Sequence, residues 1–271
     1  HQIRLVETPT GLPDARHFEC VSAPMPTPGE GEILVANRFL SLDPYMRIQM
    51  AGRHISGTIG PGDVMRGETV AEVMESRDGN FVPGQMVRCF GGWQSYAAVP
   101  AAGLSAIPGE IDPPSLALST LGMPGLTAYA GLIWQAQPKP GDVLLVPAAV
   151  GGVGAVAGQL GRIAGCRVVG IAGTDEKCRY AVEELGYDAC INRRSEDVAA
   201  RLDEVCPDGI DIYFDLVGGD LLRMASARLA VGARVILCGL MEDYNRSERS
   251  AGPPPGDWIK EGAIVIDVGM N

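Results

Sequence analysis

The 271-residue chain has few of the residues that metal sites and disulfide frameworks require. It contains only three histidines, His1, His17 and His54, and none of them sits beside a cysteine or carboxylate at a spacing typical of zinc ligands. The seven cysteines are scattered and form no CxxC pair, which indicates reduced and mostly buried thiols. The sequence therefore predicts neither a structural nor a catalytic metal.

Basic residues and long apolar runs are also scarce. Lys and Arg number 22 against 33 Asp and Glu, a net charge of −11, which argues against nucleic acid or an anionic membrane as the main partner. No apolar run approaches the roughly 18 residues that span a bilayer, and the opening HQIRLVETPT lacks the basic start and apolar core of a secretory signal. We therefore expect a soluble globular protein without a membrane partner, located in the cytoplasm.

The pattern of the chain changes near residue 113. Before it, short apolar strands are broken by glycine and proline; after it, helical segments alternate with apolar strands, which is typical of a doubly wound parallel sheet. We expect a mostly β domain over residues 1–112 and an α/β domain over 113–271. The strands predicted for the second domain are 143–146, 167–172, 189–192, 210–215, 234–238 and 263–268.

The most informative motif is a glycine turn at the end of the first of these strands. The stretch AVGGVG, residues 149–154, fits GxGxxG with alanine at its first position, and residues 158–164 can continue as a helix. Glycines in such a turn bend the chain, admit phosphates to backbone amides and let helix and strand pack closely. A tight turn that binds nothing is the alternative. We predict that Gly151, Gly152, Val153 and Gly154 hold the pyrophosphate of a dinucleotide.

The residues after the second and third strands bear on the choice between NADP and NAD. An acidic residue about 20 positions beyond the first glycine usually accepts hydrogen bonds from the ribose of NAD. Here the chain reads AGTDEKCR, with Gly173 at the strand end and Lys177 after it, and Arg193-Arg194 ends the third strand. This basic rim favours a 2′-phosphate, and so NADP, held by Gly173, Lys177 and Arg193. The pair Asp175-Glu176 leaves two alternatives open, a contact with a ribose or a helix cap.

Other segments carry side chains suited to a substrate or a nicotinamide. Tyr45 is predicted on a short helical turn and Tyr244 follows the fifth strand at the edge where doubly wound sheets bind ligands; either hydroxyl could donate to a substrate carbonyl. Thr127, expected in the first turn of a helix that opens after a proline–glycine break, could touch the cofactor or cap its own helix. Cys238-Gly239 could pack near a nicotinamide, or Cys238 could belong only to the core.

Eight separated blocks of the sequence can be compared with known families: NRFLSLDPYMR, VMRGETVAEV, GGWQSYAAV, LGMPGLTAYAGL, AAVGGVGAVAGQ, GCRVVGIAGTDEKCRY, CPDGIDIYFDLVGG and CGLMEDYN. Together they resemble the prostaglandin reductase and alkenal double-bond reductase family, a zinc-independent branch of the medium-chain dehydrogenase/reductase superfamily. The resemblance covers residues 2 to about 255 in family order. It implies a GroES-like amino-terminal domain, a Rossmann domain, and reduction of the carbon–carbon double bond of enones or enals with NADPH.

The resemblance also implies roles for residues that match the family's motifs. These are Gly151, Gly152, Val153 and Gly154 on the phosphate turn, Lys177 at the 2′-phosphate, Met123 and Thr127 at a helix start that contacts the cofactor, Cys238 and Gly239 beside the nicotinamide, and Tyr45 and Tyr244 on the substrate side. Two positions depart from the family pattern. Arg193 replaces a tyrosine that often lies against the adenosine phosphate, so binding there would rest on charge, and Leu216 replaces an asparagine.

The last residues, 257–271, depart from the family more strongly. After SAGPPPG the family continues for several tens of residues, whereas this chain reads DWIKEGAIVIDVGMN, which resembles a strand of bifunctional methylenetetrahydrofolate dehydrogenase/cyclohydrolase and could fill the last strand position. The expected partner is a small enone or enal substrate, and the expected assembly, if the chain is not a monomer, is a homodimer.

Two alternatives to an alkenal reductase stay open. One is an NADPH quinone oxidoreductase, and the other is a truncated NADPH-binding protein without catalysis.

Overall fold

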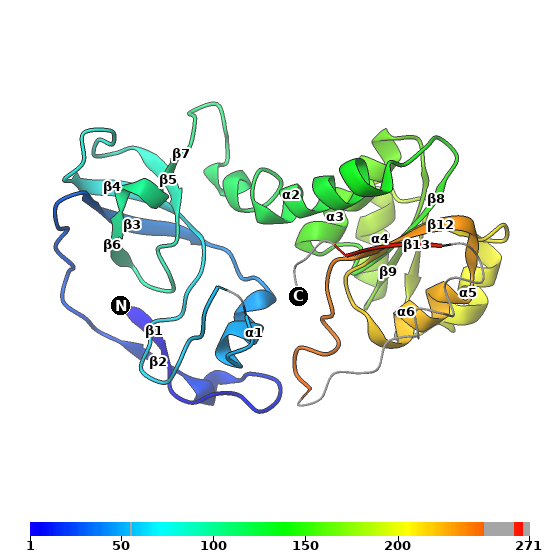
Figure 1. The fold of residues 1–271 in the computed structure, drawn as a ribbon, viewed down its shortest axis with the longest axis horizontal. Coiled ribbons are helices and arrows are strands. Elements are labelled where there is room, and N and C mark those ends of the chain that lie inside the picture. The colour runs from blue at the N-terminus through cyan, green and yellow to red at the C-terminus, as the bar shows by residue number, and fades with distance from the viewer. Residues whose placement is uncertain (55, 247–262, 268–271) are drawn as a thin grey trace. The chain divides into compact units, whose positions relative to one another are not determined.

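The computed structural model describes residues 1–54, 56–246 and 263–267 of the chain. The chain divides into two compact units, His1–Gly122 and Met123–Asn271, and Figure 1 shows their elements. Each unit has its own buried apolar core. The two are therefore described separately.

The first unit is built on antiparallel strands. A five-stranded sheet has the order β6-β3-β4-β5-β7, and β1 pairs with β2 in a separate two-stranded ribbon. Ile33 and Val35 of β3 and Ala71 and Val73 of β4 are buried on one face, the alternation that one buried face of a sheet requires. The strands are β1 (Gln2–Leu5), β2 (Phe18–Val21), β3 (Glu32–Leu40), β4 (Thr69–Ser76), β5 (Met86–Cys89), β6 (Tyr96–Pro100) and β7 (Ser105–Ala106).

Two short helical segments of this unit follow β3 and β7. Helix α1 (Tyr45–Met50) follows β3. The 3-10 turn Pro114–Leu118 places Ala117 and Leu118 against Val70 of β4. Because these contacts belong to the core of the first unit, that unit continues to Gly122, beyond the change of sequence pattern near residue 113.

The second unit contains a six-stranded sheet in which every pairing is parallel. Its order, β10-β9-β8-β11-β12-β13, is 3-2-1-4-5-6 when the strands are numbered from β8, the order of a dinucleotide-binding sheet. The strands are β8 (Val143–Pro147), β9 (Arg167–Ala172), β10 (Ala189–Asn192), β11 (Ile210–Asp215), β12 (Leu229–Leu237) and β13 (Ile264–Asp267). The predicted fold class is confirmed, and β12 begins earlier than the predicted 234–238.

Leu144, Leu145 and Val146 of β8 have no exposed surface, as expected for a central strand covered on both faces. Each such side chain contributes about 1.5–3 kcal/mol through its burial. The helices of this unit are α2 (Met123–Tyr129) with its π-helical continuation η4 (Ala130–Ala136), α3 (Gly152–Ile163), α4 (Asp175–Glu183), α5 (Val198–Val205) and α6 (Gly219–Ser226). Over the described ranges, none of the helices is long and apolar enough to cross a membrane.

The start of α2 corrects one prediction. The helix begins at Met123 and includes Pro124 and Gly125, so the proline–glycine pair does not break it. Proline is tolerated in a first turn because the N–H that it lacks has no intrahelical partner there. Thr127 is consequently the fifth helical residue and lies beyond the first turn.

The last strand position of the sheet is occupied. Residues 264–267 form β13, which runs parallel to β12 with Arg234 opposite Ile264 and Leu237 opposite Asp267, and Figure 1 shows this strand in red beside β12. The strand predicted for residues 263–268 is thus present. The remainder of the atypical tail, 257–262 and 268–271, lies outside the described residues, and its resemblance to the folate enzyme stays a prediction.

Candidate cofactor and substrate site

The glycine turn joins the carboxyl end of β8 to α3. Ala148 has a left-handed backbone conformation with φ of 53°, and Gly151 is the N-cap residue of α3, without a side chain that caps the helix. The first hydrogen bond inside the helix runs from Ala155 N–H to the Gly151 carbonyl over 2.8 Å. The amides of residues 152–154 therefore precede the helical ladder, and such amides, at the positive end of a helix, suit an anion.

The turn has no room for larger residues, which makes it suitable for a pyrophosphate. A Cβ at Gly154 would overlap the carbonyl oxygen of Ala148, and one at Gly151 would lie 3.1 Å from the same atom. Further along α3, a Cβ at Gly158 would overlap the ring of Tyr187. The glycines thus let α3 approach the sheet closely and leave the amide-lined cradle open.

The side chain of Tyr187 is hydrogen-bonded to the backbone of this turn. Its hydroxyl donates to the Gly154 carbonyl over 2.8 Å and lies 3.2 Å from the Ala149 carbonyl oxygen. Burial raises the pKa of this phenol far above its ordinary value, so the hydroxyl keeps the proton that it donates. No motif spacing in the sequence links residue 187 to the glycine turn, so this role of Tyr187 is visible only in the structure.

The predicted 2′-phosphate residues gather where β9 and β10 end. Thr174 caps α4 by accepting a hydrogen bond from the Lys177 backbone N–H over 3.2 Å, and the Lys177 side chain is exposed on the first turn of that helix. A Cβ at Gly173 would lie 3.6 Å from Nε of Arg194. Arg193 is exposed, and its N–H donates to the Ala172 carbonyl over 3.0 Å. The Arg194 guanidinium thus lies beside Gly173, and Lys177 and Arg193 are exposed on the segments that follow the two strand ends.

The ends of β11 and β12 are tied together through Asp215. Its carbonyl accepts hydrogen bonds from the N–H groups of Cys238 and Gly239 over 2.9 and 3.1 Å. Its Oδ1 accepts from the Tyr213 hydroxyl and from the amides of Val217 and Gly218, while Oδ2 is buried and has no partner among the described residues. Burial raises the pKa of this carboxyl. The backbone of Cys238 and Gly239 is thereby held in place.

The cysteine thiols are all free. Five of the seven are buried and Cys20 is exposed, so the prediction of mostly buried thiols is confirmed. Burial, followed by the charge of Asp215, raises the pKa of Cys238 to about 12, which keeps this thiol neutral. Within the described ranges, no group of three or more His, Cys, Asp or Glu residues could hold a metal ion.

The two candidate substrate tyrosines lie in different units. Tyr45 is the first residue of α1, half-buried, with its ring 5.1 Å from that of His54. Burial, with the charges of Asp43 and Glu68 as smaller causes, raises the pKa of Tyr45 to about 12. Tyr244 is half-buried in the turn of residues 241–245 that follows β12. At neutral pH the Tyr45 hydroxyl is therefore a donor.

The two candidates on α2 belong to a helix that packs beside the glycine turn. Met123 and Thr127 are half-buried, and α2 packs along α3, with Pro124 lying 3.4 Å from the position of a Cβ at Gly152. The start of α2 therefore lies directly beside the glycine turn.

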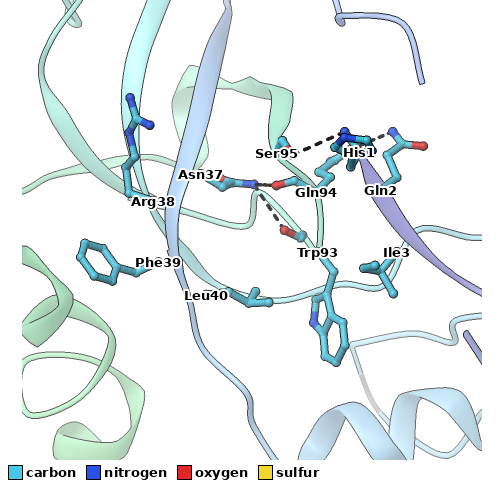
Figure 2. Close-up of a pocket in the computed structure, with 11 residues that line it drawn as sticks. His1, Gln2, Ile3, Asn37, Arg38, Phe39, Leu40, Trp93, Gln94 and Ser95 are labelled. Atoms are coloured by element: carbon cyan, nitrogen blue, oxygen red, sulfur yellow. Dashed lines mark hydrogen bonds between the residues drawn. The ribbon is translucent and has the colours of Figure 1, made fainter. Parts of the chain in front are cut away.

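A cavity of about 350 Å³ in the first unit lies away from the predicted residues. Figure 2 shows that Asn37 points toward the Gln94 carbonyl, to which its Nδ2 donates over 2.7 Å. Phe39, Leu40 and Trp93 supply apolar lining. The Asn37 amide nitrogen donates to carbonyls of residues 91, 92 and 94, whereas its Oδ1 and the Trp93 indole N–H are buried and have no hydrogen-bond partner among the described residues.

Comparison with known proteins agrees with both units. Residues 1–107 match the family described as the N-terminal domain of oxidoreductase, and residues 152–256 match zinc-binding dehydrogenase. NADPH-dependent curcumin reductase of Escherichia coli (strain K12) is 43% identical over 250 residues, 92% of this chain and 72% of that protein. Prostaglandin reductase 1 of Rattus norvegicus is 40% identical over 251 residues, 91% of this chain and 73% of that protein.

A solved structure has a closely similar fold. The crystal structure of CurA in complex with NADPH from Vibrio vulnificus is 40% identical and matches with a TM-score of 0.93, over 99% of this chain and 82% of that chain. The parallel sheet, its glycine turn and the separate antiparallel unit define a dinucleotide-binding oxidoreductase. The chain belongs to the zinc-independent medium-chain dehydrogenase/reductase family of the prostaglandin, curcumin and alkenal reductases, as the sequence predicted.

Proposed function

We propose that the chain reduces the carbon–carbon double bond of α,β-unsaturated aldehydes or ketones with NADPH. The observation that carries this proposal is the uncapped glycine turn of α3 with a basic rim at the ends of β9 and β10, in a chain 43% identical to an NADPH-dependent curcumin reductase. The relatives' names supply the substrate class. The geometry of the second unit supplies the support for the cofactor.

Different residues of the second unit would bind different parts of the cofactor. Amides of Gly152, Val153 and Gly154, with Gly151 before them, would hold the pyrophosphate, and Lys177 and the Arg193-Arg194 pair would hold the 2′-phosphate. Met123 and Thr127 of α2, with Cys238 and Gly239 after β12, would border the nicotinamide side, while Gly173 leaves room for the adenosine end. When bound, NADPH supplies a hydride to the β-carbon of the substrate.

The chemical task of the protein is to stabilise the negative charge that develops on the substrate oxygen. Tyr45 suits this task, because a phenol with a pKa of about 12 donates a hydrogen bond without losing its proton. Such a donor gains strength as charge develops and so favours the transition state over the bound substrate. Tyr244 is the proposed second donor. The Cys238 thiol, with a pKa of about 12, stays neutral and takes no part as a nucleophile.

The test is NADPH oxidation with a panel of an enone, an enal, the saturated analogue of each, and a quinone. The proposal expects turnover with the enone and the enal and none with the saturated compounds. Turnover with the quinone alone would replace it by quinone reduction. Tight NADPH binding in calorimetry, without turnover on any member, would identify a binding protein without catalysis.

Three further properties also stay proposals. The first unit, His1–Gly122, would form the substrate domain and the second, Met123–Asn271, the cofactor domain. The chain would act as a homodimer, and the cytoplasm would be its compartment. Light scattering of the purified protein tests the assembly. A mass twice that of the chain supports the dimer, and the mass of a single chain contradicts it.

A further inference from the structure

Asn192, the last residue of β10, makes a hydrogen bond with each of its polar groups close to the proposed 2′-phosphate position. It is 5% exposed, and it lies opposite Ala172 at the end of β9. Its Nδ2 donates to Oδ1 of Asp175 over 2.5 Å, its Oδ1 accepts from the Arg194 N–H over 3.0 Å, and its own N–H donates to Glu196 over 2.6 Å. A buried amide so fully bonded has a fixed orientation.

The hydrogen bond from Nδ2 of Asn192 binds the carboxylate of Asp175, the acidic residue that follows β9 most closely. Asp175 is exposed in the first turn of α4, just beyond the strand where an acidic residue commonly accepts from the ribose hydroxyls of NAD. A carboxylate turned toward that position would attract a ribose and repel a 2′-phosphate. Because Asn192 holds Oδ1 of Asp175, that carboxylate is drawn toward β10 and competes less for the ribose.

The second bond fixes the residue that supplies a cation. The Asn192 side chain accepts from the backbone N–H of Arg194, and the guanidinium of Arg194 lies beside Gly173, its Nε 3.6 Å from the position of a Cβ there. Gly173 has no side chain, so no side chain of residue 173 stands between the strand end and the guanidinium. The buried Asn192 amide therefore draws the Asp175 carboxylate toward β10 and fixes the backbone position of Arg194, which carries the positive charge.

We propose that Asn192 is a positioning residue that determines the preference for NADPH over NADH, acting through Asp175 and Arg194. The inference rests on the proposed function, because it assigns a 2′-phosphorylated dinucleotide to this site. Asn192 itself need not touch the cofactor. Its effect is a difference between two affinities, which a purely structural role would not produce.

The test measures binding to purified protein by calorimetry, with 2′,5′-ADP and 5′-AMP as probes that differ only in the 2′-phosphate, and with NADPH and NADH. Asn192→Leu removes the amide at similar volume. We expect its affinity for 2′,5′-ADP to fall about tenfold, the scale of one hydrogen bond to a charged group, and its affinity for 5′-AMP and NADH to hold or rise. An equal loss for all four probes would overturn the proposal and leave Asn192 a structural residue.

A second variant separates the two partners of Asn192. If the amide acts on NADH through Asp175, any gain of NADH affinity in Asn192→Leu disappears when Asp175→Asn is added. A gain that persists in the double variant contradicts this route. Asp175→Asn alone should change 2′,5′-ADP affinity less than it does when added to Asn192→Leu, because Asn192 already holds that carboxylate in the wild type. If the leucine variant folds poorly, Asn192→Ala serves the same comparison, and an equal effect of Asp175→Asn in both backgrounds contradicts the proposal.

Arg194 has its own test and a matched control. Arg194→Ala should lower 2′,5′-ADP affinity about tenfold and leave 5′-AMP affinity unchanged. Lys139→Ala changes the net charge equally, but Lys139 is exposed before β8, at the amino ends of the strands and so opposite the glycine turn. Equal losses of 2′,5′-ADP affinity in the two variants would mean that Arg194 acts only through the overall electrostatic potential of the protein and not by a contact with the 2′-phosphate.

These binding outcomes do not depend on turnover. If the chain binds 2′,5′-ADP and the variants behave as expected but no enone is reduced, the proposed reaction fails while the role of Asn192 stands. If enones are reduced with NADPH and Asn192→Leu leaves the discrimination between 2′,5′-ADP and 5′-AMP unchanged, the role of Asn192 fails alone.

Discussion

The hydroxyl of Tyr187 donates a hydrogen bond to the carbonyl of Gly154 over 2.8 Å. Through it, the loop that follows α4 is joined to the first turn of α3, whose amides face the proposed pyrophosphate position. Tyr187 is 2% exposed, and its ring fills the space that Gly158 leaves empty. The phosphate turn is therefore shaped from two distant parts of the chain.

Replacing Tyr187 by phenylalanine should weaken both stability and cofactor binding. The ring stays packed, but the carbonyls of Gly154 and Ala149 lose the hydrogen bond of the hydroxyl, which costs about 0.5–1.5 kcal/mol of unfolding free energy. Urea unfolding of the variant measures this loss, and calorimetry with NADPH measures the affinity. Tyr180→Phe is the matched control, because Tyr180 is 51% exposed on α4 and should change stability by less than about 0.5 kcal/mol. Equal losses in both variants would contradict the role given to the Tyr187 hydroxyl.

Tyr45→Phe should lower turnover without weakening NADPH binding. Loss of one donor to a developing oxyanion costs roughly 100-fold in kcat, while the phenyl ring can keep its packing against His54. Since the pKa of Tyr45 is raised to about 12, its hydroxyl stays protonated through alkaline pH, and the wild-type rate should show no loss from tyrosine ionisation between pH 7 and 10. Steady-state rates across that range check both statements; equal activity of the variant would return Tyr45 to a packing role.

Lys177→Ala should raise the concentration of NADPH required far more than that of NADH. The ammonium of Lys177 is exposed on the first turn of α4 beside the strand end, where a 2′-phosphate would give it a charged partner that NADH lacks. The ratio of kcat/KM for the two cofactors is the measurement, with roughly tenfold as the expected shift. An unchanged ratio would refute the assignment of this lysine.

The thiols should differ strongly in reactivity. Burial raises the pKa of Cys238 to about 12 and those of Cys166 and Cys206 to about 11, so at pH 8 almost none of these groups is the reactive thiolate. Cys20 is exposed. A coloured disulfide reagent should therefore modify Cys20 rapidly in the folded protein and the buried thiols only in denaturant. A Cys20→Ser variant that still reacts rapidly would contradict this.

The six strands of the second unit were predictable because a parallel sheet covered on both faces reads as separate apolar runs. Strands β9, β10 and β11 have the bounds that were predicted. The glycine turn was equally visible, since its residue types follow from local backbone geometry. The start of α2 was not, because whether a proline–glycine pair interrupts a helix or begins one depends on where the preceding turn ends.

The sequence by itself determined the fold class, the family and the position of the glycine turn, because each depends on residues that are neighbours or repeat at short intervals. Only the tertiary structure decided which polar groups meet. It placed the Tyr187 hydroxyl under Gly154, and it gave the Asp175 carboxylate to Asn192, which the sequence had left open between a ribose contact and a helix cap. Such pairs join separate elements, and their partners are chosen by the packing of the sheet.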